Sequence, residues 1–93
     1  MKQPTATNTI GQRIREHRLA IGRKKYDQLA KRVPAEVLKP PEDQYTQADL
    51  ARDADCAASQ VSEWESGKVI PGTLTLGKLA RALGVRLADL VGE

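Results

Sequence analysis

This sequence of 93 residues has few of the groups that disulfides, metal sites and membrane spans require. Its single cysteine excludes an intramolecular disulfide, and one histidine beside it is too little for a metal site. No apolar run approaches the length of a membrane span or a signal peptide, so we expect a cytoplasmic protein without a cofactor. Paired carboxylates, Ser/His/Asp or Cys/His sets and glycine-rich phosphate loops are also missing from any suitable context, so we do not expect an enzyme.

Aromatic residues are scarce as well, because phenylalanine is absent and only Trp64, Tyr26 and Tyr45 are aromatic. Leucine, isoleucine, valine and alanine must therefore fill the core of what the length predicts to be one small domain. Apolar residues recur at helical spacing, and none alternate as in a half-buried strand. The fold is thus predicted to be all-α.

The first predicted helix follows a polar, flexible N-terminal arm of residues 1–8. Asn8 or Thr9 can cap this helix, and we expect it to end near Gly22. Its apolar edge consists of Ile10, Ile14, His17 and Ile21. A lone histidine on such an edge is most often a packed residue and not a pH sensor.

Residues 46–67 predict two short helices joined by a tight turn. Thr46 is a good N-cap for the first helix, residues 55–57 interrupt the periodicity, and Gly67 ends the second helix. The apolar edges of the two helices comprise Leu50, Ala51 and Ala54, then Val61 and Trp64.

This segment resembles the helix-turn-helix of the lambda-repressor-like (Cro/repressor, XRE-type) DNA-binding family. That family shows a glutamine, then Leu-Ala, a small residue, a turn, an aliphatic residue and a closing Glu-x-Gly-Lys. The matching residues are Gln47, Leu50, Ala51, Ala54, Val61, Glu65, Gly67 and Lys68. The resemblance implies a compact five-helix domain over residues 9–93, in which two further helices follow Pro71 and Gly72.

The resemblance also implies that Arg18 pairs with Glu65 across the core. An arginine fork can satisfy both carboxylate oxygens while partly buried, so we interpret this pair as structural. Two positions depart from the family pattern. Asp55 replaces the usual turn glycine, and Ala57 replaces a hydroxyl cap, which forfeits about 1 kcal/mol unless Asp55 caps instead. Cys56, at a position that is usually aliphatic, is expected to be a small core residue.

By the same resemblance, the second helix of the motif enters the major groove of double-stranded DNA. Its predicted base contacts are Ala58 to a thymine methyl group, Ser59 through its hydroxyl, and Glu63 to a cytosine amino group. Phosphate contacts are expected from Gln47, Gln60, Ser62 and Lys68.

Positive charge is concentrated before the motif. Residues 1–44 carry ten Lys/Arg against five Asp/Glu, whereas residues 45–93 carry five against seven. Residues 23–44 look like an insertion between the first two helices, helical at first and then interrupted by prolines. Three roles stay open for this insertion. It can contact flanking phosphates, it can form a surface for a protein partner or the second subunit, or it can be a solvent-exposed addition without a binding role.

We therefore predict a sequence-specific transcriptional regulator, a repressor that binds an inverted-repeat operator as a homodimer. One alternative is an antitoxin that regulates its own operon and binds its toxin through the insertion. Another, supported by the acidic recognition helix, is a protein-interaction module without specific DNA binding. Candidate dimer residues, which can instead close the core, are Val85, Leu87, Leu90 and Val91.

Overall fold

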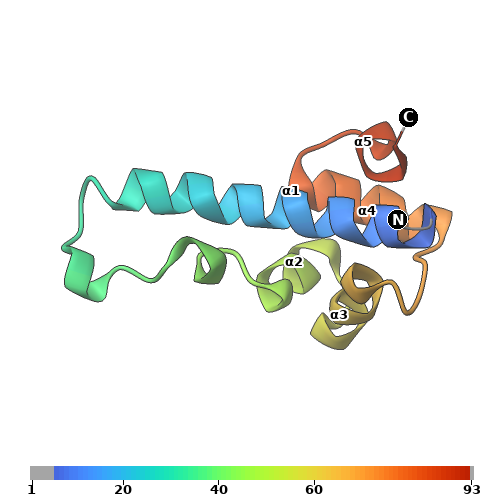
Figure 1. Cartoon of the computed structure of the whole chain (residues 1–93), viewed down its shortest axis with the longest axis horizontal. Helices are drawn as coiled ribbons and strands as arrows, with labels where there is room; N and C mark the ends of the chain where they lie inside the picture. Colours follow the sequence, from blue (N-terminus) through green and yellow to red (C-terminus); the bar gives the residue numbers. More distant parts are fainter. Residues whose placement is uncertain (1–5, 93) are drawn as a thin grey trace, which may run out of the picture.

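The fold is built from α-helices and short 3-10 helices, as a computed structural model that describes residues 6–92 shows (Figure 1). No strand occurs within that range, so the all-α prediction is confirmed. The α-helices are α1 (Ala6–Leu29), α2 (Gln47–Ala54), α3 (Ala58–Ser66), α4 (Thr73–Leu83) and α5 (Leu87–Val91). The 3-10 helices η1 (Ala35–Val37) and η2 (Pro41–Asp43) lie between α1 and α2.

Helix α1 is longer at both ends than the sequence predicts. It begins at Ala6, so neither Asn8 nor Thr9 is its cap, and only residues 1–5 of the predicted arm lie outside the described residues. The helix also continues through Gly22, the predicted stop. A Cβ on Gly22 would lie 2.5 Å from the Pro41 carbonyl oxygen. This glycine therefore allows a close backbone approach inside the helix and does not end it.

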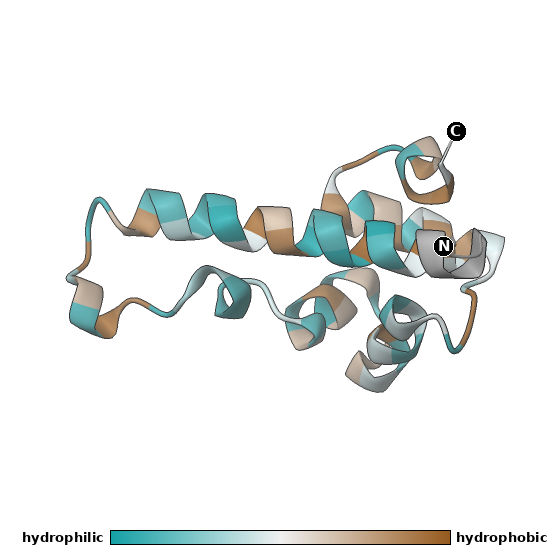
Figure 2. Cartoon of the chain, viewed as in Figure 1, coloured by the Kyte–Doolittle hydropathy of each residue, from teal (hydrophilic) through white to brown (hydrophobic). Residues whose placement is uncertain are grey.

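The predicted insertion is thus shared between α1 and a segment that returns beneath it to α2 (Figure 1). Pro34 precedes η1, while Pro40 precedes η2 and Pro41 begins it, which matches the inability of proline to continue an α-helix. The η2 turn packs on α1. Farther out, the end of α1 is mostly hydrophilic (Figure 2).

The core lies where α1 packs on α3, α4 and α5, with α2 held between α3 and α4. Every α-helix supplies one fully buried side chain, namely Ile14, Leu50, Val61, Leu79 and Leu90. Because Leu90 closes this core and Val85 packs against it, neither offers a free dimer surface. Among the predicted dimer residues, Leu87 and Val91 stay exposed.

Two residues singled out by the sequence, Cys56 and His17, are both half-buried. Cys56 packs against the core cluster, and burial raises the pKa of its thiol. A raised thiol pKa disfavours the reactive thiolate, which agrees with a packing role. None of the helices in the described range is long and apolar enough to span a bilayer.

Candidate nucleic-acid interface

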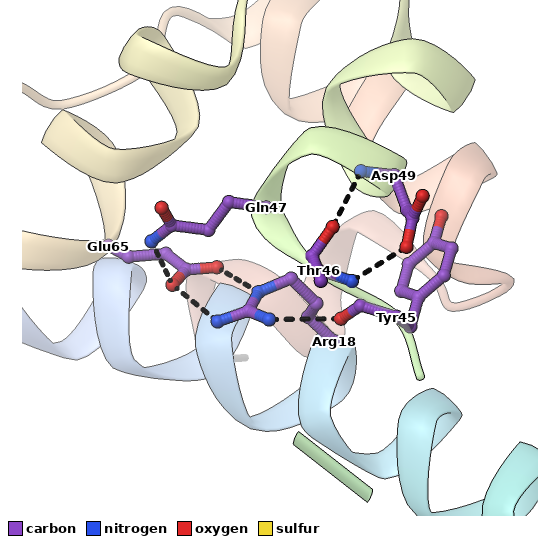
Figure 3. A network of polar contacts seen from close by, with 6 residues as sticks. All are labelled: Arg18, Tyr45, Thr46, Gln47, Asp49 and Glu65. Carbon is purple, nitrogen blue, oxygen red and sulfur yellow. Dashed lines mark hydrogen bonds and ion pairs between the residues drawn. The ribbon is translucent and has the colours of Figure 1, made fainter. Parts of the chain in front are cut away.

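The N-terminus of α2 is fixed by a reciprocal cap between Thr46 and Asp49 (Figure 3). The Thr46 hydroxyl accepts a hydrogen bond from the Asp49 N–H (3.2 Å), and the Asp49 carboxylate accepts one from the Thr46 N–H (2.9 Å). The bond from the Thr46 N–H holds the pKa of Asp49 below its usual value. This cap sets the direction in which the free amides of α2 point.

The turn between α2 and α3 contains both departures from the family pattern. Asp55 adopts the left-handed conformation (φ 60°, ψ 55°) that a glycine would adopt more easily. Ala57 is the N-cap of α3 and has no side-chain acceptor. Its own N–H donates to Oε1 of Gln60 at 3.0 Å, so Gln60 satisfies the N–H of the N-cap. The other half of the capping box, a side-chain oxygen that accepts from the first turn of α3, is not supplied by Ala57. A glutamine three residues after an N-cap is the sequence signal that would have revealed the bond to Gln60.

A buried polar network fixes α3 against α1. Nε and Nη2 of Arg18 donate to the two carboxylate oxygens of Glu65, at 2.7 and 3.0 Å. Nη1 of Arg18 donates to the Tyr45 carbonyl oxygen at 3.0 Å, at the entry to α2. Arg18 is 6% exposed and Glu65 8%, so the two charges neutralise one another out of contact with water (Figure 3). The pair therefore fixes the angle of α3 relative to α1 and α2.

Gln47 joins this network, which the sequence does not anticipate. Its side-chain amide donates to Oε1 of Glu65 at 3.0 Å, so one of its two N–H groups points inward (Figure 3). The phosphate contact expected of Gln47 stays a prediction, and the second N–H or the free amides at the start of α2 would have to make it.

Tyr45 is a second residue that the sequence does not reveal as part of the site. Its ring is buried, its hydroxyl donates to a carboxylate oxygen of Asp53 at 2.6 Å, and the ammonium group of Lys25 lies 5.0 Å from the ring centroid. Burial, followed by the hydrogen bond to Asp53, raises the pKa of Tyr45. Asp53 belongs to the following helix and Lys25 to α1, and neither stands at a motif spacing from Tyr45, so no sequence pattern indicated these contacts.

The outward face of α3 brings the predicted DNA-contacting residues together. Val61, Trp64 and Glu65 are buried, and the side chains on the opposite side of α3 face solvent. Its exposed residues include the predicted contacts Ala58, Ser59, Gln60, Ser62 and Glu63, with Lys68 exposed just after the helix. A Cβ on Gly11 would collide with the Trp64 carbonyl oxygen, so this glycine lets α1 approach the end of α3 closely.

Comparison with known proteins agrees with this geometry. A family model described as Helix-turn-helix matches residues 42–90. Over 52 residues the chain is 36% identical to multiprotein-bridging factor 1c of Arabidopsis thaliana, a match that covers 56% of the chain and 35% of that relative. The similarity thus spans about a third of the relative's length. No solved structure matches the chain significantly.

Proposed function

The chain belongs to the helix-turn-helix family of the Cro/XRE type, and from this membership we propose that it is a sequence-specific transcriptional regulator. The observation that carries the proposal is the solvent-facing side of α3, whose small and polar side chains stand clear of the core. The buried Arg18–Glu65 pair holds that face at a fixed angle. A helix presented in this way can read base edges in the major groove.

The proposed contacts differ in what each side chain can offer. The Oε1 atom of Gln60 uses one of its two lone pairs to accept the Ala57 N–H, while both amide hydrogens of Gln60 are free to donate to an acceptor on DNA. Glu63 presents acceptors, which suit a cytosine amino group, and Ser59 can donate or accept. Ala58 suits a thymine methyl group, while Ser62 and Lys68 are placed to meet phosphates.

We further propose that the protein represses transcription by occupying a promoter as a homodimer on inverted half-sites. One module contacts few base pairs, and a twofold pair roughly doubles the sequence that is read. Leu87 (41% exposed) and Val91 (37% exposed) on α5 are the proposed dimer contacts.

Selection of bound sites from random duplex DNA, followed by gel shifts with competitor DNA, tests this function. We expect one enriched inverted repeat, with binding abolished in the Ser59→Ala, Glu63→Ala double variant. Glu36→Ala removes an exposed carboxylate far from α3 in the sequence and serves as the control. If no sequence is enriched, the proposal is wrong.

A second candidate function is a protein-interaction module that retains the helix-turn-helix without specific DNA binding. It is favoured by a recognition helix without Lys or Arg, and by similarity to a relative whose name describes the bridging of several proteins. Co-purification of a stoichiometric protein partner by a chain that retains no DNA would support this candidate.

A further inference from the structure

The helix-turn-helix of this chain is poor in the charge that DNA binding requires. Residues 46–67 contain one cation, Arg52, and five carboxylates. Arg52 is itself paired, 3.3 Å from Asp49 and 3.7 Å from Asp53. Because neutralisation of phosphates supplies most non-specific affinity for DNA, that affinity must come from another part of the chain.

The prolonged end of α1, with the turn that follows it, carries the opposite charge. We call residues 23–32 the basic arm. All five of its cations are exposed, and no ion pair within residues 10–92 involves them. Lys25, Lys31 and Arg32 line one open hollow of about 570 Å³ together with Gln28 and Leu29, and no carboxylate lines it. The arm therefore presents a concentrated positive surface that has no ion-pair partner within residues 10–92.

The basic arm is held in place at its base. Gly22 lies against the Pro41 carbonyl oxygen, and the ammonium group of Lys25 lies over the ring of buried Tyr45. At a rise of about 1.5 Å per residue, Leu29 lies roughly 27 Å along α1 from Gly11, where α1 meets the end of α3. The arm thus projects past α2, away from α3 (Figure 1).

From the basic arm the chain returns through η1 and η2 to the capped N-terminus of α2. That N-terminus is the place where free backbone amides would meet a phosphate in the proposed complex. The arm therefore begins beside one proposed phosphate contact and extends away from the base-reading helix.

We propose that the basic arm binds the phosphate backbone of DNA outside the half-site that α3 reads. This inference rests on the proposed function, since it assigns a second contact region to the same complex. An acidic protein segment is also anionic and could bind the same cations. We favour DNA because the helix-turn-helix itself lacks the positive charge that binding to phosphates requires. The arm then supplies affinity, while α3 supplies the choice of sequence.

The test compares two variants with equal loss of charge. Lys31→Ala, Arg32→Ala removes two cations from the basic arm, and Lys78→Ala, Arg81→Ala removes two exposed cations from α4. Binding to a fluorescein-labelled duplex of 30 base pairs and mixed sequence is measured by anisotropy over a series of salt concentrations. We expect the arm variant to flatten the slope of log K against log salt by about two and to weaken binding about tenfold at 0.1 M salt. The α4 variant should stay close to wild type.

Equal slopes for the arm variant and the wild type would overturn the inference while leaving the proposed function intact. An equal change in the α4 variant would also overturn it, because the effect would then reflect net charge alone. A polyglutamate peptide that binds wild type and not the arm variant, with the DNA slope unchanged, would assign the surface to an acidic protein. If the wild type binds no duplex, the proposed function itself fails.

Discussion

At the residue scale, one side chain serves both the stability of α3 and its proposed contact with DNA. The Oε1 atom of Gln60 accepts the Ala57 N–H and so satisfies the N-cap of α3, while the amide hydrogens of Gln60 stay free for a partner. Glutamine often reads adenine with its donor and its acceptor together. Here the hydrogen bond from Ala57 fixes the orientation of the amide oxygen within the protein, so we expect Gln60 to act on DNA mainly as a donor to acceptor atoms.

Replacement of Gln60 by glutamate should separate these two roles. Gln60→Glu keeps the oxygen that caps Ala57 and adds negative charge at a helix N-terminus, so thermal stability should be unchanged or slightly raised. The affinity for the selected DNA should fall by about tenfold or more, because the donor is lost. Gln12→Glu adds the same charge at an exposed position of α1 and should have a much smaller effect. Equal affinities for the two variants in gel shifts would contradict a Gln60 contact.

The buried ion pair leads to a stability prediction. Arg18→Met leaves the Glu65 carboxylate buried with Gln47 as its remaining partner, so the free energy of unfolding should fall by about 3–5 kcal/mol. Urea denaturation followed by circular dichroism measures this change. The double variant Arg18→Met, Glu65→Met should be clearly more stable than the single one, because no orphan charge remains. If the single variant loses less than about 1 kcal/mol, the Glu65 carboxylate is not buried as an orphan charge when Arg18 is absent, and the prediction is wrong.

At the element scale, α1 differs most from expectation. Its glycine at position 22 looks like a stop when only the helix itself is considered. The structure shows a packing position instead, since the carbonyl oxygen of Pro41 occupies the space of a side chain. The continuity of α1 through Gly22 is therefore understood from its contact with η2, which no local pattern encodes.

Two helical glycines should respond in opposite directions to the same substitution. Gly22→Ala would force a Cβ against backbone that cannot easily move, so it should lower the melting temperature. Gly77→Ala, in α4, meets nothing within 4 Å and should stabilise the protein by about 0.5–1 kcal/mol through higher helix propensity. Thermal denaturation of both variants checks the pair. A stabilised Gly22→Ala would mean that α1 is not packed against the return segment in solution.

The cap of α2 should make stability depend on pH in acid. The pKa of Asp49 is lower in the folded protein than its ordinary value, mainly because the Thr46 N–H donates to it. Its stabilising effect is therefore full above an unfolded pKa of about 3.9 and is lost as the pH falls through the folded value. Asp49→Asn should lower the melting temperature at pH 7 and reduce its further fall below pH 4. Asp27→Asn, in the exposed basic arm, is the control. If the melting temperatures of wild type and Asp49→Asn fall in parallel as the pH is lowered, Asp49 does not have this role.

At the scale of the whole molecule, the three proposed contact regions lie on different helices. The basic arm carries five exposed cations that form no ion pair within residues 10–92, whereas exposed Leu87 and Val91 lie on α5. Helix α3 contains neither lysine nor arginine. We thus propose that the basic arm supplies affinity, that α3 reads the bases, and that α5 forms the contact between protomers.

The proposed dimer can be tested without disturbing the core. Leu87→Glu, Val91→Glu places charges on exposed α5 positions, so the monomer should fold normally while binding to an inverted repeat loses its cooperativity. Sedimentation of protein–DNA mixtures should show one protomer bound in place of two at equal concentration. Val37→Glu, which alters a side chain 70% exposed in η1, is the matched control. Two bound protomers in the α5 variant would place the dimer contact elsewhere.

The all-α class, the two motif helices and the turn between them were predictable from the sequence. Each depends on interactions within a few residues: the helical spacing of Leu50, Ala51 and Ala54, the cap at Thr46, and the stop at Gly67. The prediction of a helix-turn-helix is confirmed by the family match over residues 42–90. The outward position of the α3 residues follows from the same periodicity.

Tertiary structure decided the length of α1, the burial of Leu90, the engagement of Gln47 with Glu65, and the place of Tyr45 beside Lys25. These features depend on contacts between segments far apart in sequence, where periodicity and capping carry no information. Gly22 shows the difference most clearly. Its sequence context suggests a helix end, but the close approach of Pro41 makes it the point where α1, at the base of the basic arm, packs on η2.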